Sequence, residues 1–187
     1  MNPELSLQIK LYKTSSDSIE STSIAICDKI YTSGDNFFVF IQSKDYANEF
    51  DRLMWTYSSA KFIPHFQSES NEALIYSGYD LAKINHIGAS LELSLKASSV
   101  IMPVPLKYSL EELALSILNL QNFIDSIYLK GNDLKTLHSI CVIFCDDDKV
   151  LDRFNIFAKF IEFLKTSCIK YNLWDNTNAL KTWEKII

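Results

Sequence analysis

Two unbroken apolar runs constrain the fold of this chain more than any other feature. Residues Phe37–Ile41 and Ile140–Phe144 contain only apolar side chains. A strand with one wet face alternates apolar and polar residues, whereas a continuous apolar run needs cover on both faces. We therefore predict that both runs are inner strands of a mainly parallel sheet with helices on both sides.

Extended and helical patterns alternate around these runs. Leu5, Leu7, Ile9 and Leu11 alternate with polar residues, which indicates a strand with one wet face. The first predicted helix begins at Asp17-x-x-Glu20, a capping-box variant, and ends at a stop at Gly34, and a second begins at about Ser43. A third helix begins at the capping box Ser109-x-x-Glu112, and a fourth runs from about Lys149 to Cys168. Further strands are predicted at 73–76, 99–104, 171–174 and 182–186. This order predicts βαβ units in a single three-layer α/β/α Rossmann-like domain spanning residues 1–187.

Charge and hydropathy limit the classes of function. The chain has 187 residues and a net charge of −5, which makes non-specific binding to duplex DNA a less favoured primary activity. No apolar run reaches the roughly 18 residues of a membrane span, and the N-terminus lacks a signal pattern. We expect a cytoplasmic protein without a membrane partner.

The four cysteines do not form a metal-ligand pattern. Cys141 and Cys145 lie in one predicted strand, where four residues of rise separate them by more than about 10 Å, too far to chelate one zinc ion. We interpret Cys27, Cys141, Cys145 and Cys168 as reduced core thiols and expect no metal site.

The chain also lacks a catalytic or nucleotide-binding constellation. Its four glycines are dispersed, so a dinucleotide fingerprint or phosphate loop is excluded and no cofactor is expected. Asp146, Asp147 and Asp148 follow a predicted buried strand and could hold Mg²⁺, but acidic residues also favour a helix N-terminus, which is the preferred interpretation. The histidines are far apart, and His65 is expected to order the loop after Pro64.

A compact aromatic motif lies in the first half of the chain. Phe50-Asp51-Arg52-Leu53-Met54-Trp55 ends a predicted amphipathic helix, and Phe62-Ile63-Pro64-His65 follows after six residues. This pattern resembles the chi subunit of bacterial DNA polymerase III, best over about residues 5–77, with a weaker similarity near the C-terminus. Residues from about 78 to 140 depart from the family as an extension or insertion. The resemblance implies a clamp-loader accessory subunit without intrinsic activity.

The resemblance also implies two partners. Trp55, Phe62, Ile63, Pro64 and His65 would bind psi or a psi-like clamp-loader protein, the alternative being that Trp55 and Phe62 fill the core. Arg153, Phe157, Lys159 and Phe160 would bind the acidic, Phe-ended tail of single-stranded-DNA-binding protein, the alternative being a solvated helix face. DNA would be reached mainly through that protein. Two other functions stay open: a metal-dependent nucleotide hydrolase using Asp146–Asp148, and a direct DNA binder.

Overall fold

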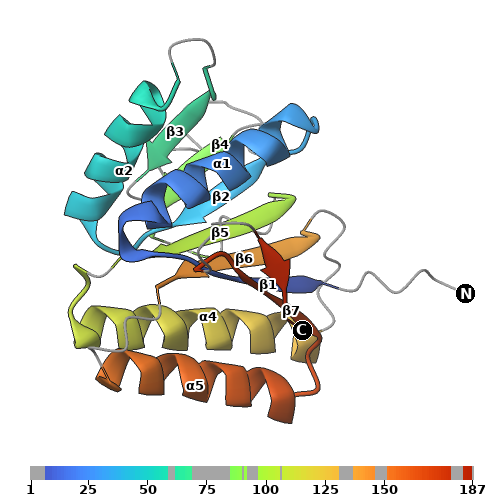
Figure 1. Cartoon of the computed structure of the whole chain (residues 1–187). Helices are drawn as coiled ribbons and strands as arrows, with labels where there is room; N and C mark the ends of the chain where they lie inside the picture. The colour runs from blue at the N-terminus through green and yellow to red at the C-terminus, as the bar shows by residue number, and fades with distance from the viewer. Residues whose placement is uncertain are drawn as a thin grey trace, which may run out of the picture.

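Eight strands of the described chain form one sheet in the computed structural model, which describes residues 7–58, 62–68, 85–89, 91, 97–105, 107–130, 137–145, 151–177 and 183–186 (Figure 1). The strands are β1 Gln8–Lys13, β2 Phe37–Phe40, β3 His65–Ser68, β4 Asn85–Gly88, β5 Ser99–Val104, β6 Ser139–Phe144, β7 Tyr171–Asp175 and β8 Glu184–Lys185. Their spatial order is β3-β4-β2-β5-β6-β1-β7-β8. All neighbouring pairs are parallel except β7 and β8.

Helices cover both faces of this sheet. Helices α1 (Ile19–Thr32) and α2 (Lys44–Thr56) lie on one face, and α4 (Leu110–Lys130) and α5 (Leu151–Thr166) lie on the other (Figure 1). Each side has its own apolar core. Strand β2 lies between β4 and β5, β6 lies between β5 and β1, and every residue of both is buried. The predicted α/β fold and its two inner strands are confirmed.

The predicted helix signals were partly right. Ser109 and Glu112 form the expected box at the start of α4: the Ser109 amide donates to Glu112 Oε2 at 2.8 Å and the Glu112 amide donates to Ser109 Oγ at 3.1 Å. The stop after α1 is also confirmed, because Gly34 has a φ of +86°, a conformation that glycine adopts without a Cβ penalty.

The predicted box at the start of α1 was wrong. Asp17 lies in a short 3-10 turn, η1 (Ser16–Ser18), and the N-cap of α1 is Ser18, which makes no side-chain capping bond. Glu20 instead accepts a hydrogen bond from the Tyr46 hydroxyl at 3.2 Å. A contact with α2 has replaced the local contact that the spacing predicted.

Two strands at one side of the sheet were not predicted. β3 and β4 are polar for strands, and β4 is held partly by the Asn85 side chain, which accepts from the Phe37 amide at 3.0 Å and donates to the Pro64 carbonyl at 2.8 Å. The predicted strand at 73–76 lies outside the described residues. The closing strands predicted near the C-terminus are confirmed as β7 and β8.

The cysteines differ from the prediction at one position. Cys27 and Cys141 are buried and Cys145 is half-buried, but Cys168 is exposed just after α5. Its φ of +54° places it in the turn that joins α5 to β7. Within the described ranges, no helix is long and apolar enough to cross a membrane.

Candidate partner-binding site

Two aromatic rings lie exposed and side by side at the end of α2. Phe50 and Met54 face the core, so Trp55, about 100° further round the helix than Met54, faces solvent. Trp55 is 53% exposed and Phe62 is 55% exposed. Their ring centroids lie 5.0 Å apart with an angle of 37° between the planes. The two rings form a continuous apolar surface, and neither fills the core.

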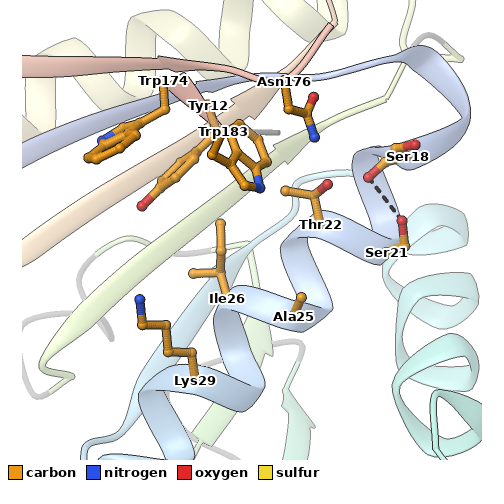
Figure 2. Close-up of a pocket in the computed structure, with 10 residues that line it drawn as sticks. All are labelled: Tyr12, Ser18, Ser21, Thr22, Ala25, Ile26, Lys29, Trp174, Asn176 and Trp183. Carbon is orange, nitrogen blue, oxygen red and sulfur yellow. Dashed lines mark hydrogen bonds between the residues drawn. The ribbon is translucent and has the colours of Figure 1, made fainter. Parts of the chain in front are cut away.

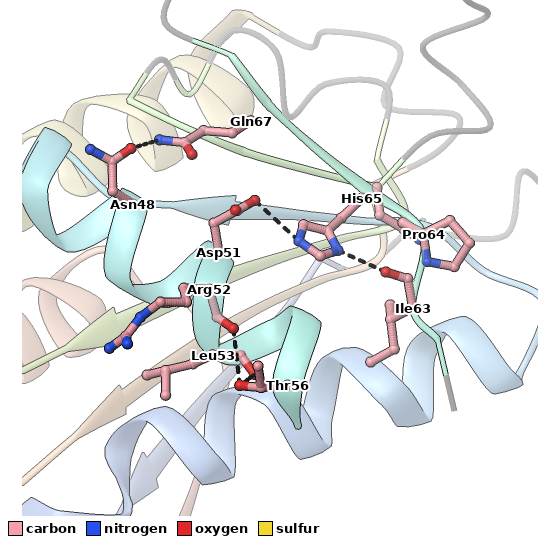
Figure 3. A network of polar contacts seen from close by, with 10 residues as sticks. Asn48, Asp51, Arg52, Leu53, Thr56, Ile63, Pro64, His65 and Gln67 are labelled. Carbon is pink, nitrogen blue, oxygen red and sulfur yellow. Dashed lines mark hydrogen bonds and ion pairs between the residues drawn. The ribbon is translucent and has the colours of Figure 1, made fainter. Parts of the chain in front are cut away.

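His65 holds this surface in place from beneath. Its Nδ1 lies 2.7 Å from the Ile63 carbonyl oxygen, so Nδ1 is the donor (Figure 3). Its Nε2 lies 3.2 Å from Asp51 Oδ1, an ion-pair distance without hydrogen-bond alignment. The His65 ring also contacts the Trp55 ring at 5.1 Å between centroids. His65 therefore joins the last turns of α2 to the segment that enters β3, as expected for a residue that orders this loop.

A second bond strengthens the same junction. The Gln67 side-chain amide donates to Asn48 Oδ1 at 2.9 Å, so β3 is tied to α2 at two points along the helix (Figure 3). An exposed ring pair on so well-connected a support loses little conformational freedom when a partner covers it.

Of the five residues predicted for this site, three are exposed and two have buried side chains. Trp55, Phe62 and Pro64 are exposed and form the outer surface, which we call the aromatic patch. Ile63 is buried, and the His65 side chain has no exposed area. Ile63 packs into the core beneath α2, so it supports the patch from inside and does not form its outer surface.

The second predicted site, on α5, has a different character from the expected one. Phe157 and Phe160 are buried, so the expected exposed apolar surface is absent. Arg153 is buried too, and its Nη1 and Nη2 donate to the carbonyls of Tyr108 at 2.9 Å and Pro105 at 2.7 Å. Lys159 is exposed. Arg153 is thus a structural link between α5 and the segment before α4.

A pocket nevertheless lies beside α5. Its volume is about 650 Å³, and it opens near the carboxyl ends of β1, β6 and β7. The apolar lining includes Phe157, Ile161 and Leu173. The charged residues that line it are the cations Lys13, Arg153 and Lys165 and the carboxylates Glu162 and Asp175. Lys13 also pairs with Asp175 at 3.7 Å. Lys159 does not line the pocket, and Lys165, about 1.7 turns further along α5, does.

No metal-binding group of side chains occurs among the residues that the structure describes. The aspartates of the hydrolase alternative, at 146–148, lie outside those residues. Burial raises the pKa of the Cys141 thiol to about 11, so this thiol is protonated at neutral pH. Burial likewise raises the pKa of Cys27 well above its ordinary value. Neither thiol has the thiolate character of a nucleophile.

Comparison with protein families identifies the first part of the chain. Residues 7–84 match the model of the DNA polymerase III chi subunit, HolC. These residues belong to the chi family. The matched segment runs from β1 to the residue before β4 and contains the whole aromatic patch, which confirms the resemblance. The remaining strands, with α4 and α5, lie outside the match.

The family assignment gives a coarse function. Chi is an accessory subunit of DNA polymerase III, so the match supports an accessory role in that polymerase for residues 7–84. No curated protein sequence matches the chain.

Solved structures resemble the whole fold. The C-terminal domain of the DEAD-box protein Dbp5 has a TM-score of 0.54 at 10% identity and covers 96% of both chains. The S. cerevisiae Dbp5 C-terminal domain bound to Gle1 and IP6 has a TM-score of 0.51 at 11% identity and covers 92% of both chains. At these identities the likeness shows the fold alone.

Proposed function

We propose that this protein is an adaptor of the DNA polymerase III clamp loader, which binds psi or a psi-like subunit through the aromatic patch. The single observation that carries this proposal is the contact between two half-exposed rings, Trp55 and Phe62, inside the chi-family segment. A folded chain gains little stability from rings in water. A partner that covers both rings removes a large apolar area at once.

The patch has the composition of an interface centre. Binding energy is usually concentrated in a few aromatic anchors surrounded by near-neutral contacts. Trp55 and Phe62 are such anchors, and Pro64 adds a rigid apolar edge. The fixed His65 support beneath them means that the surface exists before the partner arrives.

Alanine at Trp55 or at Phe62 is expected to weaken the complex with the psi-type subunit of the same organism. The expected loss is about 2 kcal/mol or more, roughly 30-fold in Kd, because each ring is a central anchor. Isothermal titration calorimetry measures the affinity, and thermal unfolding measures stability, which should change little.

Leu118→Ala is the matched control, because Leu118 is exposed to a similar extent, on α4 at the other face of the sheet. Unchanged affinity in both patch variants, with folding intact, would contradict the proposal. Equal losses in the control would show that the partner is bound non-specifically.

We further propose that the α5 pocket binds the tail of single-stranded-DNA-binding protein. An acidic peptide ending in Phe needs an apolar recess for its ring and cations for its carboxylates. The pocket offers Phe157 and Ile161 for the ring, and Lys165 and Lys13 for the charges. The predicted Arg153 also lines the pocket, but its guanidinium is already bonded to two carbonyls. The adaptor would then connect the clamp loader to coated single strands.

Charge reversal at Lys165 is expected to abolish detectable binding of such a tail peptide, while Lys159→Glu has a small effect. Both residues lie on α5, but only Lys165 lines the pocket, so attraction becomes direct repulsion at one position only. Fluorescence anisotropy of a labelled peptide at low salt measures both. Binding that persists without the terminal Phe, or that responds equally to both variants, would place the peptide elsewhere.

A further inference from the structure

A groove lies between α1 and the strands β1 and β7, far from the aromatic patch. It consists of two adjoining pockets of about 580 Å³ and about 460 Å³, which share Tyr12, Ile26 and Lys29. Figure 2 shows the larger pocket, with strand residues on one side and the length of α1 on the other. The smaller pocket continues along β1 toward Gln8.

The groove exists because β1 keeps a wet face in the interior of the sheet. Lys10 and Tyr12 alternate with the buried Ile9 and Leu11, as the sequence predicts. Helix α1 packs on β5 and β6, so β1 and β7 extend beyond its cover on this side. Polar residues on a central strand are costly unless they face water or a ligand.

Aromatic rings form the strand side of the groove. Tyr12 and Trp174 are register partners on neighbouring strands, so their side chains leave the same face of the sheet. Trp183, just before β8, packs on Tyr12 edge to face, with ring centroids 5.3 Å apart and an interplanar angle of 88°. Trp183 is exposed, so a flat surface remains available to a ligand.

Cations and hydroxyls form the remaining lining. Lys29 on α1 and Lys10 on β1 line the groove, and neither makes an ion pair within the described part of the chain. Ser21 and Thr22 line the groove from the α1 side (Figure 2). Among the described residues that line the two pockets, Asp35 is the one carboxylate. The groove therefore carries local positive charge in an acidic protein.

We propose that this groove binds a short segment of single-stranded nucleic acid. Unpaired bases stack on aromatic faces regardless of sequence, and a lysine-lined groove follows the phosphates. The groove offers aromatic faces and lysines along about 13 Å of β1, the rise of the four residues from Gln8 to Tyr12. The base faces of a duplex are stacked on one another and cannot stack on protein side chains. An acidic peptide that ends in Phe has one ring, so it would leave most of the three aromatic side chains of the groove without a stacking partner. This contact goes beyond the proposed function, in which DNA is reached through another protein.

The test is fluorescence anisotropy of a labelled oligothymidylate with the full chain. With two phosphates neutralised, log Kobs should fall with log salt at a slope of about −1.4. Trp183→Ala should weaken binding about tenfold by removing one stack, and Trp183→Phe should restore most of the affinity. Lys29→Ala should reduce the slope to about −0.7.

Tyr31→Ala and Lys170→Ala are the matched controls, because both residues are exposed and neither lines the groove. The proposal is overturned if the folded chain does not bind the oligomer at low salt, if a duplex of equal length binds as well, or if the controls lose as much affinity. It is also overturned if an acidic Phe-ended peptide binds the groove and Trp183→Ala removes that binding. None of these outcomes affects the separate titration with the psi-type subunit.

Discussion

Alanine in place of Phe160 is expected to lower the free energy of unfolding by about 3–5 kcal/mol, as for other buried aromatic residues. Phe160 has no exposed area, and it lies in the core that α5 forms with α4 and the sheet. Truncation removes the ring and leaves a cavity that the rigid sheet cannot close. Urea denaturation followed by circular dichroism measures the loss.

Lys159→Ala is the natural control, since it lies next to Phe160 but is exposed. A change within about 0.5 kcal/mol is expected there. Similar small changes in both variants would mean that Phe160 is at the surface, where the sequence had suggested a peptide-binding role.

Alanine in place of Arg153 is expected to lower the free energy of unfolding by about 3 kcal/mol, because two carbonyls each lose a charged donor worth about 1.5–3 kcal/mol. The donors are Nη1 to Tyr108 and Nη2 to Pro105. Burial lowers the pKa of the Arg153 guanidinium from its ordinary value, which agrees with an enclosed position. The same denaturation measurement applies.

Arg153→Lys should recover only part of this loss, since one ammonium group cannot reproduce the planar fork that reaches both carbonyls. Arg52→Ala is the control, because Arg52 is exposed on α2. Equal free energies of unfolding for the wild type and Arg153→Ala would contradict the structural role of Arg153. They would support the alternative that Arg153 is a surface cation available to a ligand.

The sequence predicted the centre of the sheet better than the faces of α5. The runs at β2 and β6 are apolar throughout, so burial on both sides follows from composition alone. Helix α5 has apolar residues on more than one side because it packs against α4 as well as the sheet. Its sequence does not show which of them face solvent. Arg153 was misplaced because its partner carbonyls lie 45 and 48 residues away along the chain.

The aromatic patch shows what local spacing can and cannot predict. Met54 and Phe50 fix the buried side of α2, so the outward direction of Trp55 can be read from the sequence. The contact between Trp55 and Phe62 depends on the path of the chain between α2 and β3, and the spacing of the residues does not determine that path. The burial of Ile63 depends on the same path.

The sheet also sets the distance between ligands. The patch lies beside β3 at one edge, and the groove lies along β1, toward the other end of the sheet. Five inter-strand steps of about 4.8 Å from β3 to β1 give a span of about 24 Å. A protein partner and a nucleic-acid strand would not compete for space at this separation. The chain would act as a rigid spacer: binding at one site raises the local concentration of whatever is bound at the other, with no change of shape required.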